Sequence, residues 1–204
     1  MGFKYYLSKF LKKIQIPSVK DSHIDKKAKI CSGSNVIGTT LGRYSYIGNN
    51  CTVVDCEIGS FCSIADNCNI GDMSHPLDRV TTSPVMHKGK NCLKTNFGSA
   101  EYKASAHTVI ENDVWIGDGC HIKGGVHLST GCVIGMGSVL TKDVGAYEIW
   151  AGNPAKLIRK RFGDETAEKL LKTEWWNWPD EKLSANADRF ISPAELLSGK
   201  PEKP

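Results

Sequence analysis

Aliphatic residues recur at every sixth position through most of this chain. In the second half the series is unbroken, at Ile110, Ile116, Ile122, Leu128, Ile134 and Leu140. An earlier series from Ile24 to Ile70 keeps the same step, apart from two steps of five residues. This period fits neither the 3.6-residue turn of an α-helix nor the two-residue alternation of a plain strand. It predicts short strands joined by tight corners and stacked as a parallel β-helix of about five coils.

Small residues occupy a second regular position, four residues after each aliphatic one. Five cysteines fall there, at Cys51, Cys62, Cys68, Cys120 and Cys132. A free cysteine behaves in a core as a small hydrophobic residue. We therefore expect buried, unpaired thiols and a reducing compartment such as the cytoplasm.

The periodic pattern divides the chain into three parts. Residues 1–20 predict an amphipathic helix, either a cap over the open end of the β-helix or, because its polar face is rich in lysine, a weak contact with a membrane surface. Residues 21–145 are expected to form the β-helix, with an aperiodic loop at 72–105. A long loop inside a compact domain is usually functional. Residues 146–204 predict a helical extension whose tryptophans pack against the β-helix.

Charge and hydropathy exclude several classes of protein. The net charge of +4 is too small to indicate a nucleic-acid partner. No apolar run is long enough to predict a membrane-spanning helix. Lysines interrupt the apolar N-terminal stretch, so no signal peptide is expected. These features predict a cytoplasmic protein, peripheral at the inner membrane if its N-terminal helix binds lipid.

Five short segments accompany the six-residue repeats. They are His75-Pro76-Leu77-Asp78 with Thr82-Ser83-Pro84, Asn112-Asp113-Val114-Trp115-Ile116-Gly117, Gly135-Met136-Gly137-Ser138-Val139, Thr141-Lys142-Asp143, and Gly152-Asn153-Pro154-Ala155-Lys156. With the repeats, they resemble the hexapeptide-repeat acetyltransferases, and most of all the xenobiotic branch that contains antibiotic and polysaccharide O-acetyltransferases. The resemblance implies a left-handed parallel β-helix, acetyl-CoA as the donor, and a homotrimer with an active site between each pair of neighbouring prisms.

Acetyl transfer to a hydroxyl requires a base, because a neutral hydroxyl is a poor nucleophile. His75 is the candidate, since histidine exchanges protons near neutral pH and the resemblance places the base on a loop histidine. Asp78 could orient His75, hold the acceptor or only stabilise a turn. Ser83 and His107 are the expected acceptor contacts. Arg79 stands where the family often has tryptophan, which leaves the acceptor preference open.

The resemblance places coenzyme A against residues of the second half of the chain. An outward tryptophan would line the donor tunnel, and glycine backbone groups would bind the pantetheine amides or the tetrahedral intermediate. Lysine and arginine suit the nucleotide phosphates. In the simpler interpretation, the glycines only form the corners of the coils, and the lysines and the arginine are only solvent-exposed surface charges. The expected set is Trp115, Gly117, Gly135, Gly137, Thr141, Lys142, Asn153, Pro154, Lys156 and Arg159.

Several functions remain open from the sequence. The leading hypothesis is O-acetylation of a sugar of a surface-polysaccharide precursor, followed by antibiotic O-acetylation of the streptogramin or chloramphenicol type and by amino-sugar N-acetylation. A zinc enzyme of the gamma carbonic anhydrase type would require three histidines; His121 and His127 lack an evident third, so no metal is expected. A purely structural β-helix would lack the His75 loop and the Asn153-Pro154 segment.

Overall fold

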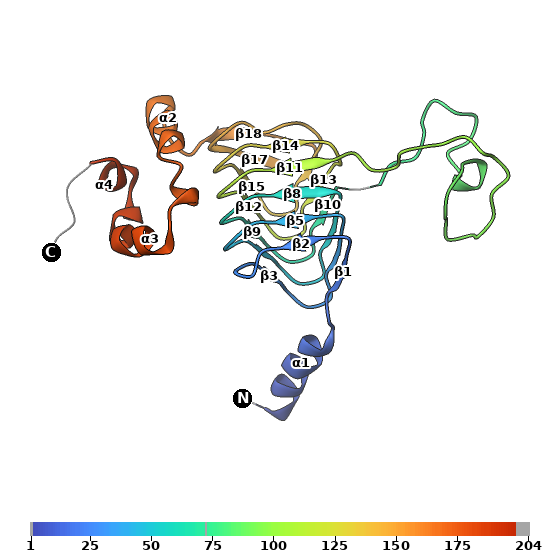
Figure 1. Cartoon of the computed structure of the whole chain (residues 1–204), viewed down its shortest axis with the longest axis horizontal. Helices are drawn as coiled ribbons and strands as arrows, with labels where there is room; N and C mark the ends of the chain where they lie inside the picture. The colour runs from blue at the N-terminus through green and yellow to red at the C-terminus, as the bar shows by residue number, and fades with distance from the viewer. Residues whose placement is uncertain (1, 72, 199–204) are drawn as a thin grey trace.

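The computed structural model describes residues 2–71 and 73–198, and its body is a three-faced parallel β-helix (Figure 1). The first face holds β1 (Ser18–Lys20), β4 (Asn35–Ile37), β7 (Thr52–Val54), β10 (Asn69–Ile70), β13 (His121–Ile122) and β16 (Val139–Leu140). The second face holds β2 (His23–Ile24), β5 (Thr40–Leu41), β8 (Cys56–Ile58), β11 (Thr108–Ile110) and β14 (His127–Leu128). The third face holds β3 (Lys29–Ile30), β6 (Tyr46–Ile47), β9 (Ser63–Ile64), β12 (Trp115–Ile116), β15 (Val133–Ile134), β17 (Glu148–Gly152) and β18 (Ala155–Lys160).

The periodic aliphatic residues fill the inside of this prism, as the sequence predicts. Parallel pairing places equivalent residues of successive coils side by side, so that Ile47 lies beside Ile64 and Ile64 beside Ile116. The predicted thiols are also confirmed as free and buried: all five cysteines of the small-residue position are in the core. Burial raises the pKa of Cys62 to about 12, which keeps its thiol protonated.

The β-helix is longer at both ends than the sequence indicates. Its first strand begins at Ser18, and its sixth level ends with β17, so the first face is a six-stranded sheet rather than part of a five-coil stack. Strand β18 then returns antiparallel to β17 at the end of the third face. The six-residue rule misses these strands because β17 and β18 are longer and β18 reverses direction. The helical part therefore begins at Asp164, not at residue 146.

The C-terminal part packs on the side of the prism. It contains α2 (Asp164–Thr173), η2 (Trp175–Asn177), α3 (Asp180–Asn186), η3 (Ala187–Ile191) and α4 (Pro193–Leu197). Trp175 and Trp176 are buried in a second apolar cluster with Tyr147, which confirms the expected packing of the tryptophans. Arg43 Nη2 in the prism donates a hydrogen bond of 2.7 Å to Trp176 O. This contact ties the helical part to the coils.

The N-terminal helix α1 (Phe3–Ile14) lies beyond the first coil, at the end of the prism away from β18 (Figure 1). The side chains of its apolar stripe that the structure describes are exposed. The stripe therefore does not cover the open end of the prism, as a cap would. Within the described residues, no helix combines the length and the apolar character needed to cross a bilayer.

The insertion leaves the prism between β10 and β11 and projects away from it (Figure 1). Its described part starts at Met73, and residue 72 of the expected insertion lies outside the described residues. One short 3-10 turn, η1 (Pro84–Met86), interrupts an otherwise irregular course. The loop carries His75 and Asp78 near its start.

Candidate active site

The two arms of the projecting loop are joined at its root. Ser74 N donates a 2.7 Å hydrogen bond to Ala104 O across the arms. The hydroxyls of Ser74 and Tyr102 are 2.8 Å apart, which adds a second link at the same level. Because Ser74 directly precedes His75, these contacts fix the backbone that carries the candidate base.

Arg79 holds the middle of the loop together. Its Nη1 donates to His87 Nδ1 at 2.8 Å and its Nη2 donates to Glu101 O at 2.9 Å. The guanidinium also lies over the Tyr102 ring, 5.6 Å from the ring centre. His87 is only 6% exposed, so water has little access to replace Arg79 as the hydrogen-bond partner of its ring. Arg79 thus stabilises the loop. The sequence shows only that arginine stands where the family often has tryptophan, and it does not indicate this role.

His75 has the geometry of a general base. Its Nδ1 lies 2.8 Å from Thr82 O. A carbonyl oxygen can only accept, so Nδ1 carries the proton and Nε2 keeps its lone pair. The side chain is exposed, so this nitrogen is open to an incoming acceptor. The loop therefore fixes the tautomer that a base requires.

The other residues expected around the acceptor are not joined to His75. Asp78 is exposed, and in the described part of the chain it forms no hydrogen bond or ion pair with His75. Ser83 is half-buried and its N–H donates to Thr81 Oγ1 at 3.1 Å. His107 Nδ1 lies 2.8 Å from Asp55 Oδ1 on the prism, and this hydrogen bond holds the pKa of Asp55 below its ordinary 3.8. Their contact with an acceptor remains a prediction.

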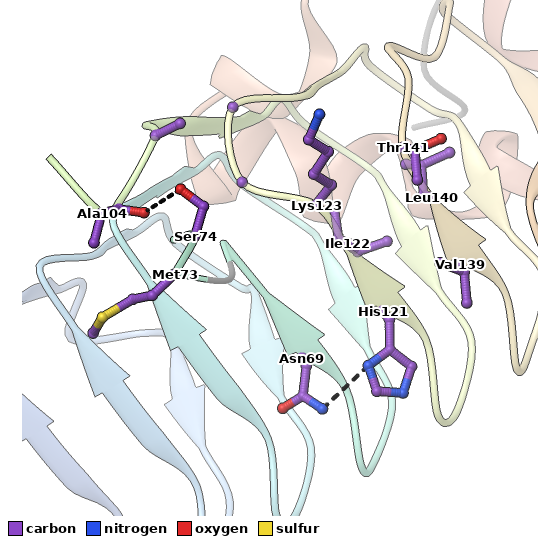
Figure 2. Close-up of a pocket in the computed structure, with 13 residues that line it drawn as sticks. Asn69, Met73, Ser74, Ala104, His121, Ile122, Lys123, Val139, Leu140 and Thr141 are labelled. Carbon is purple, nitrogen blue, oxygen red and sulfur yellow. Dashed lines mark hydrogen bonds between the residues drawn. The ribbon is translucent and has the colours of Figure 1, made fainter. Parts of the chain in front are cut away.

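A pocket of about 560 Å³ lies at the root of the loop, against the upper coils of the first face (Figure 2). Ser74 forms one wall, and Thr141, an expected phosphate contact, forms another. His121 also lines it, and Asn69 Nδ2 donates to His121 Nδ1 at 3.3 Å. Lys123 completes the polar lining. The structure thus brings Thr141 close to the residue that precedes the candidate base.

Sequence reasoning did not identify Asn69, His121 and Lys123 as lining this pocket. The signal was present in the register, because Asn69, His121 and Val139 lie side by side on neighbouring strands of the first face. Each precedes an inward aliphatic residue, so each must point outward. The pairing of Asn69 with His121 is difficult to recognise in the sequence, because the repeat breaks at residue 70 and the whole insertion separates the two residues.

The remaining expected donor contacts lie on the third face. Trp115 is 53% exposed and pairs with Val133 on the next strand. Val133 pairs with Ile149, which pairs with Arg159 on β18, so Trp115 and Arg159 share one row. Lys156 is an exposed residue of the same β18 strand.

The connection from β17 to β18 contains Asn153 and Pro154, which are joined by a cis peptide bond. Both residues are exposed at the end of the third face. Lys142, in contrast, follows Thr141 at the end of the first-face strand β16 and is also exposed. One prism therefore separates the expected donor contacts into a first-face group and a third-face group.

The three glycines expected to bind the donor use their N–H groups elsewhere. Gly117 N donates to Ile134 O, Gly135 N to Trp150 O, and Gly137 N to Asp118 O, each at 2.8 Å. These three N–H groups are therefore not free to bind pantetheine or a tetrahedral intermediate. The simpler interpretation holds for Gly117, because a Cβ there would lie 2.6 Å from Met136 N. Glycine is needed where one coil lies directly on the next.

A metal centre gains no support from the geometry. Among residues 2–71 and 73–198, no group of three histidine, cysteine, aspartate or glutamate side chains is placed to hold a metal ion. His121 lies on the first face and His127 on the second. His127 Nε2 instead lies 2.8 Å from Glu111 Oε1.

Comparison with known proteins gives consistent results. Residues 107–142 match the family model of the bacterial transferase hexapeptide (six repeats). A probable macrolide acetyltransferase of Lysinibacillus sphaericus is 42% identical over 123 residues, which span 60% of this chain and 68% of that protein. A chloramphenicol acetyltransferase of Klebsiella aerogenes is 42% identical over 132 residues, 64% of this chain and 60% of that protein.

A solved structure shows the same fold. A mutant of AntD, an N-acyltransferase from Bacillus cereus in complex with dTDP and coenzyme A, superposes with a TM-score of 0.53 at 20% identity, covering 86% of this chain and 96% of that one. The fold is the parallel β-helix that the repeats predict, with the left hand that the resemblance implies. The repeats, the loop and the match to the macrolide enzyme together show that the chain belongs to the hexapeptide-repeat acetyltransferase family.

Proposed function

We propose that this protein transfers an acetyl group from acetyl-CoA to a hydroxyl of a small-molecule acceptor, with His75 as the general base. The observation that carries this proposal is the 2.8 Å contact of His75 Nδ1 with Thr82 O, which leaves Nε2 as a proton acceptor. Nε2 takes the proton of the acceptor hydroxyl while the oxygen of that hydroxyl attacks the thioester carbonyl carbon. When the carbon–sulfur bond breaks, His75 returns that proton to the departing thiolate. No enzyme nucleophile is required.

The residues present suit coenzyme A on chemical grounds. Lys156 and Arg159 supply exposed cations for phosphate on β18, and Trp115 supplies an exposed flat surface in the same row as Arg159. Thr141 and Lys142 supply a second polar group beside the loop. Asn153 and Pro154 lie in the turn between β17 and β18, directly before the strand that carries Lys156 and Arg159.

The division of these residues between two faces supports an active site shared between copies of the chain. A second prism could bring its third face to the first-face pocket and His75 of its neighbour. The loop projects from its own prism (Figure 1) and exposes apolar side chains such as Leu77 and Phe97, which suits an interface. A head-to-tail contact of this kind forms either a closed ring or an open filament. The family resemblance implies a ring of three, so we infer a homotrimer.

Two classes of hydroxyl acceptor are candidates, and an amino sugar acetylated on nitrogen is the third alternative. A sugar hydroxyl of a surface-polysaccharide precursor is the acceptor that the sequence resemblance favours. An antibiotic hydroxyl is the second candidate, and the names of the two relatives at 42% identity favour it. The free thiols support a reducing, cytoplasmic location in either case.

The test is acetylation of a defined panel followed by mass spectrometry. Purified protein is incubated with acetyl-CoA and with sugars, nucleotide sugars, amino sugars, chloramphenicol, macrolides and streptogramins. We expect one class to gain an acetyl group, and His75→Ala to lower kcat by about 10²–10⁴-fold. His23→Ala, an exposed histidine of β2 on the prism, is the matched control and should keep full activity.

The outcomes separate the parts of the proposal. An acetylated sugar supports the leading acceptor, and an acetylated antibiotic supports the second one. Acetylation of an amino group would replace O-transfer by N-transfer. Full activity of His75→Ala would show that His75 is not the base, and a protein that does not bind acetyl-CoA would contradict the proposed reaction itself.

A further inference from the structure

Helix α1 presents an apolar stripe that the rest of the described chain leaves uncovered. Phe3 is 80% exposed, Phe10 is 62% exposed and Ile14 is 53% exposed. Leu7 and Leu11 are exposed too, and none of these side chains belongs to either apolar cluster of the protein. In Figure 1 the helix stands off from the first coil instead of lying across it. The stripe therefore has no occupant within the described part of the chain.

The opposite side of α1 is basic. With 3.6 residues per turn, the aliphatic and phenylalanine positions fall within one side of the helix. The lysine positions 9, 12 and 13 fall on the other side, and position 4 falls at the edge of the apolar stripe, next to Leu11. The helix sequence FKYYLSKFLKKI contains no acidic residue. Lysine positions at the edges of the polar side would lie level with the surface into which the apolar stripe inserts. This is the pattern of a helix that lies in the plane of a membrane interface.

Charge complementarity indicates what the occupant is. A second copy of the chain would bring the same four lysine positions to the contact, and like charges would oppose it. An anionic lipid surface attracts each lysine by about 1 kcal/mol within a Debye length. It also accepts exposed phenylalanine and leucine at the boundary of headgroups and acyl chains.

We propose that α1 docks this protein onto an anionic lipid surface. The apolar stripe enters the interface, and the lysines contact the anionic headgroups. This docking is independent of the acetyl transfer proposed above, since α1 contributes no residue to the site.

Co-sedimentation of the full chain with vesicles tests the proposal. One vesicle type contains phosphatidylglycerol and phosphatidylcholine, and the other contains phosphatidylcholine alone. We expect binding to the anionic vesicles only, and weaker binding as the salt concentration rises. Lys4→Gln with Lys12→Gln should weaken binding about 25-fold, or about fivefold for each lysine. Phe10→Asp with Leu11→Asp should reduce binding at least tenfold by placing carboxylates in the apolar stripe.

Ile191→Asp is the matched control, because Ile191 is an apolar residue on η3 that is at least as exposed as Phe10 and lies far from α1 in the chain. It should bind vesicles as the unchanged protein does. All variants should unfold at the same temperature, since α1 does not pack in the core. Absence of binding, or equal binding to both vesicle types, would overturn the proposal. So would a larger assembly in sedimentation velocity that only Phe10→Asp with Leu11→Asp dissolves, because the stripe would then face a second copy.

Discussion

Replacement of Arg79 by alanine tests whether the loop is braced as the contacts indicate. The change removes the hydrogen bonds from the guanidinium to His87 Nδ1 and Glu101 O. Hydrogen bonds from a charged donor contribute about 1.5–3 kcal/mol each, and Arg79 is half-buried, so the lower value applies. The free energy that favours this hydrogen-bonded loop over its locally unfolded form should therefore fall by about 3 kcal/mol. A change of this size raises the population of the locally unfolded loop about 100-fold.

Hydrogen exchange measures that population directly. Ser74, Lys88 and Phe97 donate their backbone N–H to Ala104, Ala100 and Val85 across the loop. In Arg79→Ala these amides should exchange up to about 100-fold faster, whereas the amides of the coils should not change. The kcat for acetyl transfer should fall because His75 loses its fixed position, and the KM for acetyl-CoA should stay the same.

Lys88→Ala is the control in the same loop. Lys88 forms an ion pair of 2.9 Å with Glu101, but both side chains are exposed. Such a pair contributes about 0–1 kcal/mol, so exchange and kcat should change little. Unchanged exchange at Ser74 and unchanged kcat in Arg79→Ala would refute the role of Arg79 as a brace.

Two further predictions concern the prism. Ile116→Ala removes a fully buried side chain of β12 and should lower the free energy of unfolding by about 2–5 kcal/mol in chemical denaturation, whereas Met136→Ala at an exposed corner should change it by less than about 0.5 kcal/mol. The hydrogen bond of His107 lowers the pKa of Asp55, so its stabilising effect is present above pH 3.8 and is lost as the pH falls through the lowered pKa. Asp55→Asn should therefore destabilise the protein near neutral pH and have no effect in acid; an equal effect at both pH values would contradict this reasoning.

The sequence predicted the prism well because its core is periodic. Each inward position, such as Ile64 or Ile116, requires an aliphatic side chain, as do the inward positions of the coils beside it. The position of Cys62 in the same way requires a small side chain. Strand β18 escaped prediction because its antiparallel pairing with β17 breaks that periodic pattern. A pattern of inward residues also says nothing about whether a terminal helix packs, so the exposed stripe of α1 had to come from the structure.

The site was predictable only in part for a different reason. His75 follows from its residue type and its place in the loop, but its tautomer depends on Thr82 O, a backbone atom seven residues away. The brace joins Arg79, His87 and Glu101, which share no spacing that a repeat could reveal. The N–H groups of the corner glycines bond to carbonyls of other coils, as Gly117 N does to Ile134 O, and the short motifs around these glycines do not specify those partners.

The measurement that tests the central claim most directly is acetyl transfer by mixed assemblies. One chain carries His75→Ala, and the other carries Lys156→Glu with Arg159→Glu on the third face. Each variant alone should be inactive, because every site lacks either the base or the phosphate contacts. If one copy supplies His75 and its neighbour supplies the third face, an equal mixture assembled together should regain about a quarter of the wild-type activity. No regained activity in assemblies that demonstrably contain both chains would contradict the shared site.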